Sequence, residues 1–421
     1  IATFALDRAR RLAQELGTPD SLRGVLVALH QLGNIDMARG DLHVAQAKFL
    51  EGLEIARHLA QELGTPESRR DVSVSLDQLG GIDETRGDLD AAQAKFLEGL
   101  EIARRLAQEL GTPGSLRDVS LSLNRLGNID EARGDLDAAQ AKFLEFLENS
   151  RHLAQELGTP ESRRDVAASL SRLGNIDQAR GNLDAAQAKF LEGLEIRRRL
   201  AQELGTPNSR RNVSVSLNQL GDIDQARGDL DAAEAKFVEC LEIARHLAQK
   251  LGTPESLRDV SVSLSQLGGI DVARGDLDAA QTKRIEAIDV FTQVASQLDT
   301  PGAWWSVAIE TDALADLLEA GERWEEGVEQ RLLALPLFQT AAQDTDDPMQ
   351  WRSVAVTNSQ IADTLAHLDR GEESETHRRS AVEQFNRIAK EIDTAEAWRS
   401  VAIETNKFAD LLEAGERWEE G

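Results

Sequence analysis

The side chains best suited to chemistry in this sequence are three histidines and one cysteine, and all of them occupy repeated positions. His58, His152 and His246 recur 94 residues apart, each four residues after a glutamate. Side chains spaced so widely along a regular array do not converge on one metal ion. We therefore interpret them as exposed residues on helix surfaces. Cys240 stands where an equivalent segment has Gly52, which predicts a small buried packing residue in place of a reactive thiol.

Motifs of catalytic chemistry are missing from the chain. It contains no glycine-rich phosphate loop, nucleophile elbow, His-Glu-x-x-His or Cys-x-x-Cys. Carboxylates are abundant, but none is spaced with a partner base as acid–base catalysis requires. The sequence thus predicts a non-enzyme with no cofactor and no metal.

Charge and composition exclude further classes of protein. The net charge is −27, and residues 302–421 hold 26 acidic against 11 basic side chains. Such a field repels phosphate backbones, and with no tyrosine the chain lacks platforms for stacking bases. No apolar run reaches the length of a membrane span, and the first residues do not resemble a signal peptide. We expect no nucleic-acid or membrane partner and a soluble, cytoplasmic protein.

A 47-residue repeat organises the chain. Gly-Thr-Pro recurs at this interval, and the register continues through Pro301 and Pro348 to Ala395. A unit of this size is one supersecondary element that must stack on its neighbours to bury its apolar face. We predict a partial repeat at residues 1–19, the end of a second helix, then six near-identical repeats at 20–301 and diverged repeats at 302–421, the last truncated. Both ends fall within a repeat, so we expect a piece of a longer polypeptide.

Each repeat is predicted to hold two amphipathic helices. In residues 67–113, apolar side chains follow helical spacing over about 66–86 and again over 89–110. Gly87-Asp88 separates the helices, and Gly111-Thr112-Pro113 reads as a C-terminal glycine, an N-cap and a first helical proline. Gly80 inside the first helix indicates that the second helix approaches closely. Asp83 and Arg86, three apart and recurring in every repeat to Arg274, predict a local ion pair.

These positions resemble the tetratricopeptide repeat. The run Leu32-Gly33-Asn34, followed by Gly40-Asp41, Ala45 and Phe49, matches the family's leucine–glycine pair, interhelical glycine, small residue and aromatic residue. The unit is longer than the family's 34 residues, and an aspartate stands where the first helix usually has an aromatic residue. The resemblance implies an all-α fold, a right-handed α-solenoid of stacked antiparallel helix pairs.

The same resemblance implies a partner-binding face. In the family, the first helix of each pair lines a concave groove that selects peptides or proteins. Asn, Ser and Gln side chains there can donate and accept hydrogen bonds, which suits recognition of a peptide backbone; drift at solvated positions is the alternative. The candidate residues are His30, Asn34, Met37, Asp77, Gly81, Glu84, Asn124, Asn128, Glu131, Ser171, Asn175, Gln178, Asn218, Asp222 and Gln225.

The diverged repeats contain all six tryptophans. Trp304, Trp351 and Trp398 are 47 residues apart, which predicts packing between helices. Trp305 breaks this pattern and is a candidate for an exposed anchor in a partner site. Pro336 lies in the middle of a predicted second helix and should kink or end it.

Together these features predict a recognition or sensor scaffold within a larger cytoplasmic protein. Its partner would be a neutral or basic protein or peptide segment. Long, nearly identical arrays of this kind resemble those of bacterial signalling or defence proteins. A self-assembling structural scaffold and the regulatory region of an enzyme whose catalytic domain lies outside this segment are the alternatives.

Overall fold

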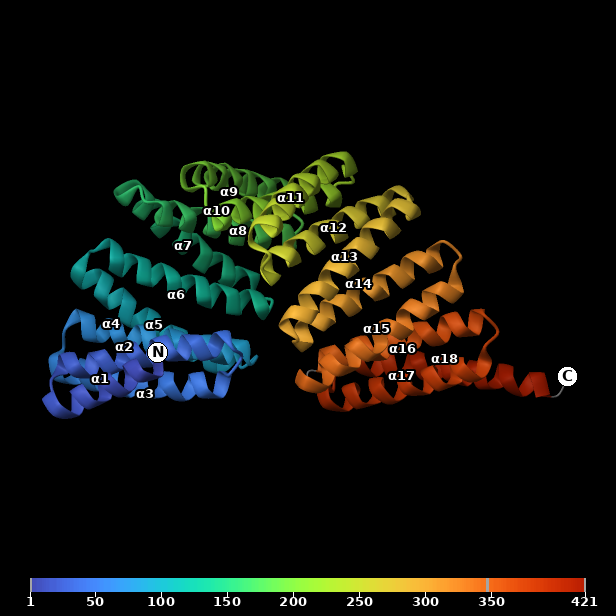
Figure 1. Cartoon of the computed structure of the whole chain (residues 1–421), viewed down its shortest axis with the longest axis horizontal. Helices are drawn as coiled ribbons and strands as arrows, with labels where there is room; N and C mark the ends of the chain where they lie inside the picture. The colour runs from blue at the N-terminus through green and yellow to red at the C-terminus, as the bar shows by residue number, and fades with distance from the viewer. Residues whose placement is uncertain (1, 346–347, 420–421) are drawn as a thin grey trace. The chain divides into compact units, whose positions relative to one another are not determined.

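The computed structural model describes the backbone of residues 2–345 and 348–419 and the side chains of residues 4–344 and 348–413. Within these ranges the chain forms eighteen α-helices and no strand. It divides into two compact units, unit 1 (Ile1–Gly205) and unit 2 (Thr206–Gly421). In each unit consecutive helices pack against one another as antiparallel pairs (Figure 1), which confirms the α-solenoid fold.

We call the first helix of each repeat helix A and the second helix B. Unit 1 begins with α1, after which four A–B pairs follow. Its helices are α1 (Ala2–Leu16), α2 (Pro19–Ala38), α3 (Leu42–Leu63), α4 (Pro66–Thr85), α5 (Leu89–Leu110), α6 (Pro113–Ala132), α7 (Leu136–Leu157), α8 (Pro160–Ala179) and α9 (Leu183–Leu204).

Unit 2 continues the alternation from a helix A to a final helix A. Its helices are α10 (Pro207–Ala226), α11 (Leu230–Leu251), α12 (Pro254–Arg274), α13 (Leu277–Leu298), α14 (Pro301–Ala320), α15 (Trp324–Thr345), α16 (Pro348–His367), α17 (Gly371–Ile392) and α18 (Ala395–Glu419).

The helix ends follow from the residues that the repeat keeps. Gly111 ends α5 in the left-handed conformation (φ 58°), and its amide donates to the Ala107 carbonyl at 2.9 Å. Thr112 then caps α6, its hydroxyl accepting from the Ser115 amide at 3.3 Å. Between the paired helices, Gly87 (φ 81°) makes the turn and Asp88 caps α5. These contacts confirm the predicted helix ends and caps.

The core of the uniform repeats is built on a glycine beneath a phenylalanine. A Cβ at Gly127 would lie 2.5 Å from the ring of Phe143, and the same close approach recurs at four other glycines. The predicted proximity of helix B is thereby confirmed for Gly33, Gly80, Gly127, Gly174 and Gly221. At Gly268 helix B is also in contact, but Arg284 replaces the phenylalanine, and a Cβ would lie at an ordinary 3.6 Å from Ala280 and Arg284.

Diverged repeats use a buried arginine at the phenylalanine position. Arg331 of α15 is 1% exposed and contacts Asp316 and Glu319 of α14, with Asp312 at 3.5 Å. Arg378 of α17 pairs with Asp363 of α16 and, at 2.8 Å, with Glu404 of α18. One charged side chain thus joins three consecutive helices.

The predicted Asp–Arg pair within each helix A is wrong. Asp130 is buried against helix B, where the ammonium group of Lys142 reaches it. Arg133 is the C-terminal cap residue of α6, and its guanidinium donates hydrogen bonds to Asp90 and Gln93 of the preceding repeat. The reason is burial: only a side chain from the packed helix reaches the aspartate, and the arginine joins neighbouring repeats instead.

Two expectations for the diverged repeats also change. Helix α15 does not end at Pro336 but runs through it to Thr345. Trp304 and Trp351 are half-buried in packing, as predicted, whereas Trp398 on α18 is 41% exposed. In the described residues α18 packs against α17 and, through Glu404 and Lys407, contacts Ser359 and Asp363 of α16, so little covers that ring.

Candidate functional site

The predicted partner-binding residues lie on helices A, spaced by four and then three residues along one face of each helix. We call this surface the helix A face. In unit 1 it spans α2, α4, α6 and α8; in unit 2, α10 carries Asn218, Asp222 and Gln225. Asn34 and Gln225 are exposed, Ser171 is buried, and the remaining members are half-buried.

His30 joins two repeats on this face. Its Nε2 lies 3.0 Å from the Ser75 hydroxyl of α4, and its ring meets Phe49 edge-on at 6.0 Å. Burial lowers the pKa of His30, and the nearby Asp71 carboxylate opposes this only partly. The neutral imidazole therefore serves the stacking of α2 and α4 more than it offers a free binding group.

Arg125 connects the next two repeats and was not among the predicted residues. From α6 its guanidinium lies 3.6 Å from Asp77 and 3.4 Å from Glu84, both on α4, and 5.9 Å from the centre of the Phe96 ring. Burial raises the pKa of Asp77, and Arg125 counteracts that shift. Asp77 and Glu84 thus form one charged cluster with a shared cation.

The asparagines offer unsatisfied hydrogen-bonding capacity. Among the described residues, the side-chain oxygens of Asn128 in unit 1 and Asn218 in unit 2 are buried without a donor. An unsatisfied buried acceptor costs about 1–3 kcal/mol. Asp222, also on α10, is half-buried, and burial raises the pKa of its carboxyl.

Ser171 is engaged within unit 1. The buried Arg197 of α9 donates to its hydroxyl at 3.0 Å and to the Ala167 carbonyl at 3.3 Å. Burial lowers the pKa of Arg197 to about 10. Ser171 therefore takes part in helix packing, and Arg197, at a position usually held by alanine, could not have been predicted to do so.

A row of aliphatic side chains runs beside the polar residues. Val27, Val74 and Leu121 are 50%, 39% and 49% exposed, and they precede His30, Asp77 and Asn124 by three residues. In unit 2, Val215 precedes Asn218 in the same way and is 43% exposed. Sequence analysis missed this row, although a Val or Leu at one constant position in successive helices is a signal for it. The helix A face is thus both apolar and polar.

Trp305 is not the exposed anchor that the sequence predicts. It is half-buried, and its ring packs edge-on against Phe338 of α15 at 4.8 Å between ring centres. Pairing of α14 with α15 brings the two aromatic side chains together. The ring therefore belongs to the core of the diverged repeats.

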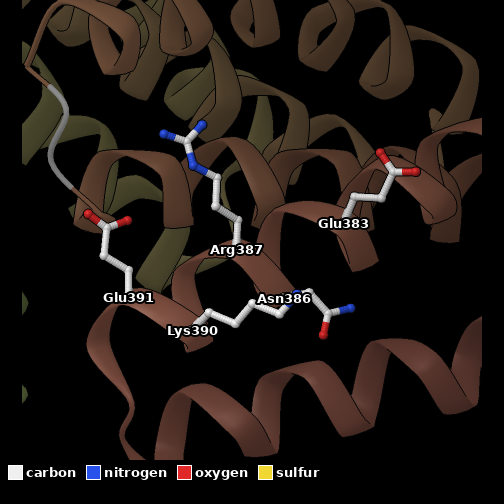
Figure 2. A pocket seen from close by; sticks show the side chains of 5 residues that line it. All are labelled: Glu383, Asn386, Arg387, Lys390 and Glu391. Atoms are coloured by element: carbon white, nitrogen blue, oxygen red, sulfur yellow. The ribbon is translucent and has the colours of Figure 1, made fainter.

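The hollows described in the structure lie away from the predicted residues. Three lie on faces of helices B: about 570 Å³ on α7, about 370 Å³ on α9 and about 740 Å³ on α17. Figure 2 shows the last, lined by charged and amide side chains of α17 such as Glu383 and Lys390. A fourth, of about 220 Å³, lies among α16, α17 and α18. None of the residues that line these four belongs to the helix A face, which is an open surface.

The histidines and the cysteine behave as predicted. The side chains of His58 and His152 are 64% and 66% exposed, each within 4 Å of a glutamate one turn on. Cys240 is buried and lies 3.5 Å from the Ser214 carbonyl, and burial raises the pKa of its thiol to about 12. Within the described residues no three His, Cys, Asp or Glu side chains are placed to hold a metal ion. Nor does any described helix have the length and apolarity to cross a membrane.

Helix pairs with capped ends, stacked at a fixed 47-residue interval, define an α-solenoid repeat protein. A family model of the tetratricopeptide repeat matches residues 165–245. The leucine–glycine, alanine and phenylalanine positions of the matched residues recur in the other uniform repeats, so these repeats are similar to tetratricopeptide repeats but longer. No curated protein matches its sequence.

The solved structures that share this fold include a quorum sensor and a signal-transduction ATPase. The apo form of the quorum sensor NprR from B. thuringiensis is 13% identical with a TM-score of 0.52, and the match covers 91% of this chain and 98% of that one. A signal-transduction ATPase with a tetratricopeptide-repeat sensor from Pyrococcus horikoshii is also 13% identical, with a TM-score of 0.51. That match covers 93% of this chain but 53% of the ATPase. At this identity the likeness concerns the fold alone.

Proposed function

We propose that this chain is a non-catalytic recognition scaffold whose helix A face in unit 1 binds a peptide or protein segment. The observation that carries the proposal is the composition of that face. Val27, Val74 and Leu121 are exposed beside polar side chains that differ between repeats, whereas the buried Gly–Phe packing beneath them is constant. A constant frame with a variable surface is what selection of a partner requires.

The partner is a neutral or basic segment with aliphatic side chains. Aliphatic groups of the partner cover the row of Val27, Val74 and Leu121, and its backbone N–H groups donate to amide oxygens such as that of the exposed Asn34. The chain's charge of −27 repels acidic segments and accelerates the approach of basic ones. Binding therefore weakens as salt rises.

The setting we propose is a larger cytoplasmic protein of bacterial signalling or defence. The sensors among the structural neighbours support this by analogy of fold. An enzyme regulated by the array, with its catalytic domain outside this segment, is compatible with the same face.

A peptide-display selection tests the proposal. Random peptides are selected on the immobilised full chain, and the enriched peptides are measured against V74S/L121S and N124A/N128A variants. We expect enrichment of aliphatic and basic residues, and at least about tenfold weaker binding to each variant.

The matched control is H58A/H152A, which changes exposed side chains on helices B of the same unit. It should bind the peptides as the wild type does. Equal weakening by the control, or no weakening by the helix A variants, would contradict the proposal.

A further inference from the structure

A second apolar row in unit 1 lies on the outer faces of helices B. Leu50, Leu97, Leu144 and Leu191 occupy the same repeat position on α3, α5, α7 and α9 and are 47%, 48%, 50% and 49% exposed. A leucine half exposed on the same turn of four successive helices is unusual for a surface that meets only water.

Ion pairs between adjacent helices B hold these leucines at one level. The residue after each leucine is a glutamate that pairs with an arginine of the preceding repeat. The distances are 2.8 Å for Arg57–Glu98, 2.7 Å for Arg104–Glu145 and 2.8 Å for Arg151–Glu192. Leu97, Leu144 and Leu191 therefore lie at equivalent positions of α5, α7 and α9, and we call them the leucine row.

Each of two leucines in the row stands beside a hollow on its own helix. The hollow on α7, of about 570 Å³, is lined by Leu144, Leu147, Glu148 and Arg151, among others. The hollow on α9, of about 370 Å³, is lined by the equivalent Leu191, Leu194, Glu195 and Arg198. Projections and hollows thus recur on one face with the same 47-residue interval.

The charges around the row are self-complementary. Glu101 and Arg105, one turn apart on α5, pair with each other beside Leu97, and His152 lies one turn after Glu148 on α7. Acid and base alternate on this face although the chain as a whole is strongly acidic. An antiparallel copy of the same face would set glutamates against arginines and histidines.

Unit 2 contains a natural contrast on α17. There Arg379, 61% exposed, stands at the leucine position, and the hollow is lined by Glu383, Asn386, Arg387, Lys390 and Glu391 (Figure 2). The hollow is present on α17, but the exposed leucine beside it is replaced by an arginine. The surface on α17 therefore lacks what a matching copy needs.

We propose that the leucine row of α5, α7 and α9 is an interface for a second copy of this chain, packed antiparallel with the leucines of each copy in the hollows of the other. Both shape and charge repeat every 47 residues, and a second copy of the chain presents the same interval. A two-fold pairing of this kind uses one patch on both copies. The interface is small, so association is weak and depends on protein concentration.

Sedimentation equilibrium of the full chain over a wide range of protein concentration tests this. The average mass of the wild type should rise from one copy toward two. The L97S/L144S/L191S variant should require at least about tenfold more protein to reach the same mass. The matched control L63S/L110S/L157S removes three leucines that are 44%, 43% and 47% exposed at the C-terminal ends of α3, α5 and α7, and it should associate as the wild type does.

A charge exchange provides a second readout. Glu101→Arg should weaken association, and adding R105E should restore it, because reversing both charges preserves complementarity in an antiparallel pair. Circular dichroism establishes that each variant is folded. A wild type that keeps the mass of one copy, growth beyond two copies, equal effects of the two triple variants, or no rescue by R105E would each overturn the proposal.

Discussion

The uniform repeats and the diverged repeats fill the same position of helix B with different side chains, a phenylalanine in the former and an arginine in the latter. In the former, Phe143 of helix B lies directly on Gly127 of helix A, an apolar contact that leaves no room for a Cβ. In the latter, Arg331 takes the phenylalanine position and is buried among carboxylates of α14. The fold thus tolerates either a close apolar contact or a buried ion cluster at its centre.

The difference has a consequence for function. The apolar contact between Gly127 and Phe143 does not use the helix A positions of Asn128 and Glu131, so these two positions can vary from repeat to repeat. The buried ion cluster engages the equivalent positions, since Asp316 and Glu319 hold Arg331. We infer that recognition by varied helix A residues belongs to the uniform repeats.

The largest expected effect is loss of the buried arginine. Arg331→Ala should lower the free energy of unfolding of the diverged repeats by about 3–5 kcal/mol, because it leaves Glu319 and Asp316 without their cation. All six tryptophans lie in residues 302–421, so tryptophan fluorescence during urea unfolding reports on this region.

The matched variant A315G/R331F installs the glycine and phenylalanine of the uniform repeats. It should recover at least half of the loss. A fluorescence midpoint for Arg331→Ala equal to that of the wild type would show that the ion cluster contributes nothing to the packing.

The next largest effect is expected when a methyl group is added to the glycine that packs beneath the phenylalanine. Gly127→Ala should destabilise by about 1–3 kcal/mol, since its Cβ overlaps the Phe143 ring. Gly268→Ala should stabilise by about 0.5–1 kcal/mol, because Arg284 leaves space and alanine favours a helix. Circular dichroism during urea unfolding measures both, and two changes of the same sign would refute the packing account.

Stability in the diverged repeats should depend on pH through Asp312. Burial, with Asp316 and Glu319 adding to it and Arg331 opposing it, raises the pKa of Asp312 to about 6. The folded state therefore binds this proton more tightly than the unfolded state, and the stability it contributes below pH 4 is lost as pH rises through about 6. Asp312→Asn should stabilise by about 1–3 kcal/mol at neutral pH and have no effect near pH 4.

Tryptophan fluorescence at both pH values checks this expectation. Destabilisation by Asp312→Asn at neutral pH would mean that the charged form is favoured in the fold, against the direction of the pKa shift.

The smallest expected effect concerns the ion pairs of the uniform repeats. Arg133→Ala should cost less than about 1 kcal/mol, because the Asp90 side chain that it pairs with is 95% exposed. Lys142→Ala should cost about 1–3 kcal/mol, because it leaves the buried Asp130 carboxylate unpaired. If Arg133→Ala costs more than Lys142→Ala in urea unfolding, the main partner of Asp130 is Arg133 on its own helix and not Lys142 on helix B.

Sequence reasoning reached the fold because its signals are local. Gly111-Thr112-Pro113 marks a helix boundary by conformation alone, and the bounds of α5 are those predicted. It failed where a side chain pairs with a residue that comes close only when the helices pack against one another. Asp130 had Arg133 close in sequence but meets Lys142 in space, and Trp305 meets Phe338.

Part of the candidate site could also be predicted from local sequence signals. Helical spacing placed residues such as Asn124 and Asn128 on one face. The roles of His30, Ser171 and Arg125 depend on contacts between repeats, which no spacing within one helix reveals.

Hydrogen exchange of the full chain, with and without a peptide from the display selection, reports which helices the peptide covers. We expect slower exchange in α4 and α6 on binding, with α5 and α7 unchanged, and no such protection in the V74S/L121S variant. Protection confined to helices B, or an equal response of the variant, would place recognition away from the helix A face.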